Sequence, residues 1–214
     1  MTGTSPAARR RWPVRWIATG AVAALVVAMA LSTEYRSADS ASAAAPKKFD
    51  PATFGADNYE AKVVPAIQKS AVELPVLLKA ITADKDAAGA KYGKRQGTSP
   101  YNFAVKATGV AGEAKSGLLP VTVDGLPDGT RVSIQIGPAI NGTALRDAAG
   151  YITFGQFVNQ VEYADAATAL NNQMRQKLLT GLDAAALKGK KIAFTGAFSL
   201  LTPATVTITP VAIS

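Results

Sequence analysis

The residues best suited to chemistry lie close together, in a loop from Gly137 to Asp147 and at the start of the helix expected after it. An arginine guanidinium pairs with a carboxylate or a phosphate through parallel N–H bonds, so Arg146 is a candidate anion clamp. Side-chain amides bond sugar hydroxyls, which makes Asn159 and Gln160 candidate contacts for a carbohydrate. The full set of candidate binding residues is Asn141, Thr143, Arg146, Asp147, Asn159 and Gln160.

The same side chains also suit a purely structural role. They can tie the loop to the following helix and satisfy backbone groups that would otherwise lack hydrogen bonds. Gly137, Pro138 and Gly142 are the expected turn residues of this loop. We favour the structural interpretation of the loop and keep ligand binding as the alternative.

Composition excludes much of enzyme chemistry. The 214 residues include no Cys and no His, which removes thiolate nucleophiles, disulfides, Ser-His-Asp triads and thiolate or imidazole metal ligands. We therefore expect no catalytic residue, no metal and no cofactor. The enzymatic alternative is a carbohydrate-active hydrolase that uses the carboxylates of Asp147 or Glu162, although no carboxylate pair is visible in one element.

The N-terminal segment has the features of a membrane anchor. Four arginines precede an apolar run from Ile17 to Leu31, with Trp12 and Trp16 at the arginine end. Counted from Trp12, the run has about the ~20 residues that a spanning helix needs. We predict a cytoplasmic tail and uncleaved signal anchor over residues 1–31, a flexible linker over 32–48, and a C-terminal domain outside the cytoplasm. A cleaved signal peptide, which gives a secreted protein, is the alternative.

An apolar stripe with helical spacing follows the linker. Its members are Tyr59, Val63, Ile67, Ala71, Leu74, Leu78 and Ile81. Steps of three and four residues indicate a helix that is buried on one face. Asp57 or Asn58 is the expected cap at its start, and Pro65 and Pro75 predict a kink or two consecutive helices. We expect residues 49–98 to form a helical segment that packs on the domain after it.

From residue 99 onward the apolar period changes to two, as in half-buried strands. The expected strands cover residues 101–108, 119–123, 131–136, 191–199 and 205–209, with a further short strand at 151–154. A helix carrying Tyr163 to Leu178 and ending at Gly181 separates the third long strand from the fourth. This order is that of an OB-fold, a five-stranded Greek-key barrel. We predict an α+β chain in which residues 99–214 form an OB-fold-like barrel; an unrelated α+β sandwich is the alternative.

Nucleic-acid binding by such a barrel needs aromatic side chains on its open face and a basic groove. Tyr101 and Phe103 share the inward phase of their strand, whereas the outward positions carry Lys106, Arg131 and Gln135. We therefore expect no nucleic-acid partner.

Several motifs of the chain are similar to an uncharacterised family of predicted periplasmic lipoproteins. They are Tyr92-Gly93, Gly137-Pro138-Ala139-Ile140, Gly142-Thr143, Arg146-Asp147, Phe157, Asn159-Gln160 and Tyr163. The resemblance implies a single-domain envelope protein, often encoded near sugar ABC transporters, with no assigned activity. This chain departs from the pattern because it lacks the lipidated Cys, so the helix of Ile17 to Leu31 is then its anchor.

Together, these features predict a non-enzymatic, membrane-tethered binding or accessory module that faces outward. Its expected partners are the membrane, through the N-terminal helix, and, as the resemblance implies, a transporter of sugars or its solute-binding protein.

Overall fold

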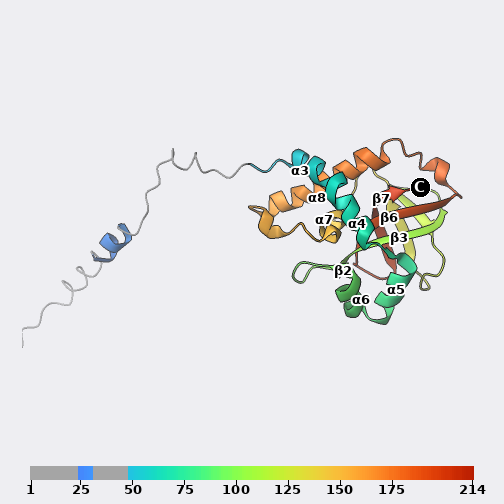
Figure 1. The fold of residues 1–214 in the computed structure, drawn as a ribbon, viewed down its shortest axis with the longest axis horizontal. Helices are drawn as coiled ribbons and strands as arrows, with labels where there is room; N and C mark the ends of the chain where they lie inside the picture. Colours follow the sequence, from blue (N-terminus) through green and yellow to red (C-terminus); the bar gives the residue numbers. More distant parts are fainter. Residues whose placement is uncertain (1–23, 31–47) are drawn as a thin grey trace, which may run out of the picture. The chain divides into compact units, whose positions relative to one another are not determined.

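The computed structural model describes residues 24–30 and 48–214 (Figure 1). Contacts divide the chain into two units, Met1–Lys48 and Phe49–Ser214. Residues 24–30 are helical, but most of the anchor predicted from Ile17 to Leu31 and nearly all of the predicted linker lie outside the described residues. Within the described part, no helix has both the length and the apolar character needed to cross a membrane.

The second unit opens with short helices: α3 (Pro51–Asn58), the π-helical η1 (Tyr59–Val63), α4 (Val64–Ser70), α5 (Leu74–Ala83) and α6 (Lys85–Tyr92). The predicted apolar stripe is buried, except that Ala71 is half-buried. The expected interruption is also present, because the chain becomes extended after α4 and Pro75 lies in the first turn of α5.

The predicted start of the first helix was wrong. Asp50 caps it, accepting a hydrogen bond from the Ala52 amide at 3.1 Å, and Pro51 occupies the first helical position. An aspartate followed by proline suits a helix start well, because proline has no N–H to leave unpaired there. Asn58 instead lies within the helical run and donates to the Phe54 carbonyl at 2.8 Å.

Five strands close into a barrel: β3 (Asn102–Ala111), β4 (Leu118–Thr122), β5 (Arg131–Gln135), β7 (Thr205–Ile213) and β6 (Lys191–Ser199), which pairs back with β3. β5 and β7 are parallel, and the other barrel neighbours are antiparallel. This is the strand order expected of an OB-fold, so the α+β prediction with a five-stranded barrel is confirmed.

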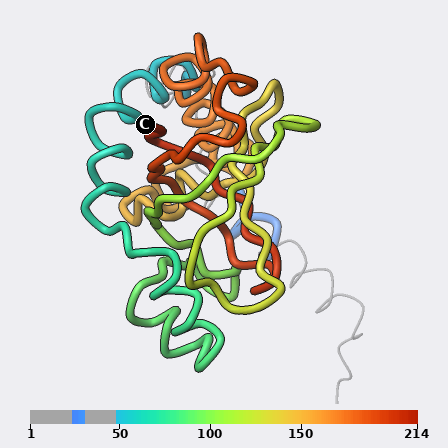
Figure 2. The backbone as a smooth tube through the Cα atoms, turned by 90° about the vertical axis from the view of Figure 1, so that its right-hand side faces the viewer, coloured from blue at the N-terminus to red at the C-terminus, as the bar shows by residue number. Residues whose placement is uncertain are grey.

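The helical segment is joined to the barrel through β3. Of β3, only the end, at Val110 and Ala111, pairs with β4. Two short strands of the helical segment, β1 (Val72–Glu73) and β2 (Gly93–Lys94), pair with the earlier part of β3. Figure 2 shows the helices, in cyan to green, running along one side of the barrel strands.

Two cores lie on opposite sides of the barrel wall. The interior core holds Phe103, Phe198 and Ile134 and receives Leu74 and Leu78 from α5. The outer core packs α4, α7 (Ala144–Ala149) and α8 (Gln160–Met174) against the wall, where the barrel contributes Ala104, Ala197 and Val211. β3 and β6 therefore bury residues on both faces, and Asn102 to Val105 are all buried in succession.

The segment between α7 and α8 departs from the predicted strand at 151–154. Gly150 has a left-handed backbone and ends α7, and Phe154–Gln156 form the short 3-10 helix η2. Side chains supply hydrogen bonds in place of those that a neighbouring strand would make: the Gln96 amide donates to the Ile152 carbonyl at 2.9 Å. The predicted helix follows as α8, continues through η3 (Arg175–Leu179) and ends close to Gly181, as expected.

A substitution at Gly196 tests how tightly β6 and β7 approach. Gly196 lies at the register shift between these strands, and an added Cβ would come within 2.5 Å of the Thr209 carbonyl oxygen. We expect Gly196→Ala to lower the free energy of unfolding by about 1–3 kcal/mol, because backbone must move. The control, Gly155→Ala, meets nothing within 4 Å and should stay within about 0.5 kcal/mol of the unsubstituted protein.

Urea unfolding of both variants makes the comparison. Equal stability of Gly196→Ala and Gly155→Ala would contradict the described approach of the two strands.

Candidate functional site

Arg146 is a buried cation that links two helices. It lies on α7 and is 6% exposed. Its Nε donates to Asp147 Oδ1 at 2.7 Å, and its Nη1 donates to the carbonyl of Tyr163 on α8 at 2.8 Å. The guanidinium carbon also lies 3.4 Å from the centroid of the Tyr163 ring. A guanidinium taken out of water needs a counter-charge and hydrogen-bond acceptors, and this arrangement supplies both.

Asp147 is the centre of the surrounding hydrogen-bond network. Thr143 donates its hydroxyl to Asp147 Oδ2 at 2.7 Å, and the Tyr163 hydroxyl donates to Oδ1 at 3.3 Å. Burial, followed by the negative charge of Asp147, raises the pKa of Tyr163. A tyrosine phenol is protonated at neutral pH, and the Tyr163 hydroxyl acts as a donor toward the carboxylate.

Aromatic rings hold the segment before α8 in place. Phe154 and Phe157 contact the Tyr163 ring with centroid distances of 5.6 and 5.4 Å. Phe157 in turn contacts Phe49 and Phe54 near the start of the unit. The resulting cluster fixes the position of Tyr163 and leaves Phe154 partly exposed.

A cavity of about 350 Å³ opens beside this network. Its walls include Gln96, Phe154, Gln160 and Tyr163, as well as Arg146 and Asp147. The Nη2 group of Arg146 has no hydrogen-bond partner among the described residues. Tyr151 Oη is the one buried side-chain nitrogen or oxygen without a hydrogen-bond partner in the described structure. Arg146 Nη2, which is also unpaired there, is therefore not fully buried and keeps access to solvent. Gln160 is exposed and its amide is likewise unpaired in the described structure.

The other predicted residues are placed elsewhere. Asn159 caps α8 by accepting from the Glu162 amide at 2.9 Å, and Glu162 accepts from the Val158 amide at 3.1 Å. Asn141 and Gly142 line a separate pocket. The predicted turn residues join by a cis peptide at Gly137-Pro138, and Gly137 and Gly142 both have left-handed backbones. The loop also ends earlier than expected, because α7 begins at Ala144.

Two wall residues were missed as site residues from the sequence. Tyr163, the first apolar position of the expected helix, lies three positions after Gln160 and lines the same cavity. Gln96 reaches the cavity from a loop more than fifty positions earlier, bonding to Ile152 across that separation. Helical spacing could have indicated Tyr163, but no local pattern indicates Gln96.

The hydrolase alternative finds little support in these contacts. Asp147 accepts three hydrogen bonds, and Glu162 is engaged at the start of α8. Glycoside hydrolysis needs two carboxyl groups that flank the scissile bond. Among the described residues that line the cavity, Asp147 is the one carboxylate, and no cluster of potential metal ligands occurs in the described chain.

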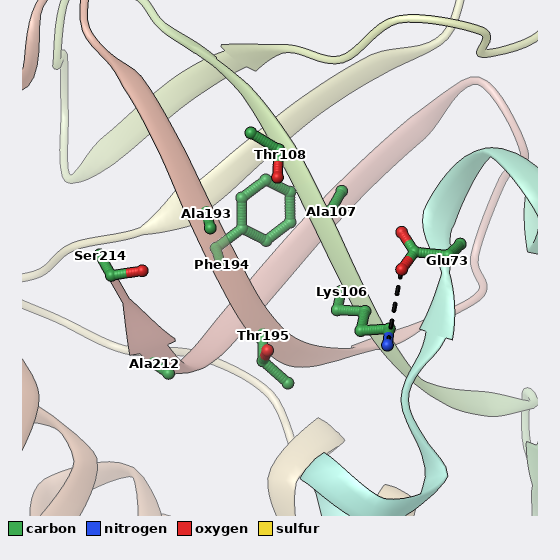
Figure 3. Close-up of a pocket in the computed structure, with 9 residues that line it drawn as sticks. All are labelled: Glu73, Lys106, Ala107, Thr108, Ala193, Phe194, Thr195, Ala212 and Ser214. Carbon is green, nitrogen blue, oxygen red and sulfur yellow. Dashed lines mark ion pairs between the residues drawn. The ribbon is translucent and has the colours of Figure 1, made fainter.

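A smaller hollow of about 180 Å³ lies on the outer side of β3 and β6. Figure 3 shows its polar feature, the ion pair between Glu73 of β1 and Lys106 of β3, with a distance of 3.5 Å. Both side chains are more than half exposed, so the pair contributes on the order of 0–1 kcal/mol. The charges satisfy each other, and the hollow offers no buried donor to a ligand.

Comparison with known proteins places the chain in a family. A family model described as "Predicted periplasmic lipoprotein (DUF2291)" matches residues 21–214. The chain belongs to this family of predicted periplasmic lipoproteins. The family is one of unknown function, and its description places its members outside the cytoplasm. The predicted resemblance and the extracytoplasmic location are thus supported at the level of the family.

One solved structure supports the fold independently. It is an OB-fold protein from Thermotoga maritima MSB8, with a TM-score of 0.61 and 20% sequence identity. The alignment covers 78% of this chain and 99% of that protein. At this identity the likeness concerns the fold alone. No curated protein is significantly similar to the chain in sequence.

The structural part of the Arg146 network is open to a direct test. Arg146→Ala removes both hydrogen bonds of the buried guanidinium, and we expect the free energy of unfolding to fall by about 1–3 kcal/mol. Arg95→Ala is the matched control, because Arg95 is exposed and makes no hydrogen bond or ion pair among the described residues; its guanidinium carbon lies 4.3 Å from the centroid of the Tyr101 ring. We expect the control to lose no more than about 1 kcal/mol.

Chemical unfolding followed by circular dichroism measures both changes. A loss for Arg146→Ala no larger than that for Arg95→Ala would show that the network does not hold α7 to α8.

Proposed function

We propose that this protein is a non-catalytic, membrane-tethered binding module outside the cytoplasm, and that its ligand occupies the cavity beside Arg146. The observation that carries the proposal is the unpaired Nη2 of Arg146. Its other nitrogens are fixed by Asp147 and by the Tyr163 carbonyl, so the free N–H groups are held in one orientation. A donor that is ordered before the ligand arrives loses little entropy on binding.

The walls of the cavity favour a ligand rich in oxygen. Arg146 Nη2 offers N–H groups to a carboxylate, and the amide of Gln160 can bond hydroxyl groups. The rings of Phe154 and Tyr163 supply an apolar wall for the carbon skeleton. Asp147 already neutralises one positive charge within 2.7 Å, so a ligand with a single carboxylate fits this site better than a doubly charged phosphate.

We extend the proposal to an accessory role in the transport of sugars. The family resemblance suggests a transporter or its solute-binding protein as the partner. The wall residue Phe154 is an exposed apolar residue, as are Val158 and Val161, which lie two positions before and one position after the wall residue Gln160 in the sequence. A surface of this kind supports contact with another protein once the ligand is bound. The membrane is the other partner, through the predicted helix of Ile17 to Leu31.

Calorimetric titration tests ligand binding, with D-glucuronate as the probe because it combines one carboxylate with several hydroxyls. We expect the full chain in mild detergent to bind D-glucuronate and Gln160→Ala to weaken it about three- to tenfold, the loss of one hydrogen bond. The Gln160 side chain has no hydrogen-bond partner among the described residues, so the unfolding free energy should not change. Gln68→Ala is the control, because Gln68 is also exposed and unpaired in the described structure but lies on α4, away from the cavity.

Inorganic phosphate serves as the comparison ligand and should bind more weakly than D-glucuronate. The proposal fails if D-glucuronate does not bind, or if Gln160→Ala and Gln68→Ala bind it equally well.

A further inference from the structure

A second cavity, of about 420 Å³, lies on the outer wall of the barrel and shares no wall residue with the cavity beside Arg146. One side is formed by the outward positions of adjacent strands, namely Leu118 of β4, Gln135 of β5 and Thr209 of β7. The loop that contains Asn141 forms the other side, and Leu201 lies in the turn between β6 and β7. The cavity has the size of a small-ligand site.

Gln135 makes this cavity rigid. Its side chain is 7% exposed, and its amide nitrogen donates to the Asn141 carbonyl at 3.0 Å and to Thr209 Oγ1 at 2.8 Å. Its amide oxygen accepts from the Asn141 backbone N–H at 2.8 Å. The buried glutamine therefore fixes the backbone of the loop against the strands and orients the groups on both sides of the cavity.

The fixed groups retain unused hydrogen-bonding capacity. Thr209 accepts from Gln135, and its own hydroxyl proton has no acceptor among the described residues. The side-chain amide of Asn141 has no partner in that part of the chain either, although its backbone is held at both its N–H and its carbonyl. Ser116 and Thr207 add further hydroxyls to the wall.

Charge and apolar surface narrow the ligand class. Among the described residues that line the cavity, none is acidic or basic. These walls therefore provide no counter-charge for an anion or a metal ion, and no basic groove for nucleic acid. Leu118 and Leu201 are exposed at its rim, the latter by 79%. Walls that combine hydroxyl and amide groups with two exposed aliphatic side chains suit a molecule that carries both hydroxyls and an exposed C–H face.

We propose that this cavity is a second binding site, specific for a neutral polyhydroxyl ligand of the size of a mono- or disaccharide. The Asn141 amide and the Thr209 hydroxyl bond the ligand hydroxyls, and Leu118 and Leu201 contact its C–H face. The proposal rests on the geometry of this cavity and does not depend on the site beside Arg146.

The test uses the full chain in mild detergent, with D-glucose and maltose as probes and calorimetric titration as the measurement. We expect at least one of the two sugars to bind. Asn141→Ala should lower the affinity for that sugar about tenfold, equivalent to about 1.4 kcal/mol, and Leu201→Ser should also lower this affinity. Neither side chain makes a described hydrogen bond, so both variants should fold normally. Asn172→Ala, an exposed and unpaired asparagine of α8, is the matched control and should bind the sugar as the unsubstituted protein does.

Testing each variant with the ligand of the other site separates this proposal from the previous one. Gln160→Ala should leave D-glucose and maltose binding unchanged, and Asn141→Ala should leave D-glucuronate binding unchanged. The proposal is overturned if neither neutral sugar binds, if Asn141→Ala binds as tightly as Asn172→Ala, or if Gln160→Ala abolishes neutral-sugar binding.

Discussion

A guanidinium that is removed from water must be paired, and the pairing of Arg146 organises the part of this molecule around the candidate site. Asp147 supplies the charge and the Tyr163 carbonyl supplies an acceptor from another helix. Satisfying the cation therefore requires α7 and α8 to lie side by side. The same requirement brings the Tyr163 ring against the guanidinium and positions the aromatic cluster that holds the segment before α8. The Arg146 side chain thus both holds the two helices together and shapes the proposed binding site.

The barrel wall imposes a second constraint. Because β3 and β6 bury residues on both faces, the interior core and the outer helical core are separated by one pair of strands. Ala104 and Ala197 face the helices and have small side chains, so α4 and α7 can approach the strands closely. Small residues on the outer face and large ones inside are the pattern of a wall packed on two sides. Both proposed sites lie outside the barrel: one is lined by residues of α7 and α8, and the other by outward positions of β4, β5 and β7.

The strand order was predictable from the sequence because the barrel strands alternate with a period of two. Most large apolar residues of the strands lie inside the barrel, and the helix between the third and fourth barrel strands has its own apolar stripe. The same pattern wrongly predicted a strand at 151–154. Backbone carbonyls of this segment accept hydrogen bonds from the side chains of Gln96 and Gln156, and the segment pairs with no neighbouring strand in the described structure. The first helix start was missed because the stripe begins at Tyr59, whereas the cap at Asp50 lies in a segment with little apolar periodicity.

The candidate site was predictable only in part, for a similar physical reason. Arg146, Asp147 and Gln160 meet at one cavity, whereas Asn159 caps a helix and Asn141 faces a different pocket. These asparagines are alike in sequence terms, and only the three-dimensional arrangement of the loop separates their roles. Gln135, which fixes that loop, was assigned from its strand phase to an outward position. That assignment was correct, but the loop covers it, and burial by a distant segment leaves no periodic signal.

The central claim is that Arg146 is held by the protein on one side and is available to a ligand on the other. Side-chain NMR of ¹⁵N-labelled arginine, recorded during titration with D-glucuronate, tests it most directly, because it reports on Nε and Nη2 of Arg146 separately. The account predicts that the Nε signal, protected by Asp147, changes little while the Nη2 protons shift and exchange more slowly with water. A titration that leaves Nη2 unchanged, or that perturbs Nε strongly and so displaces Asp147, would contradict the account.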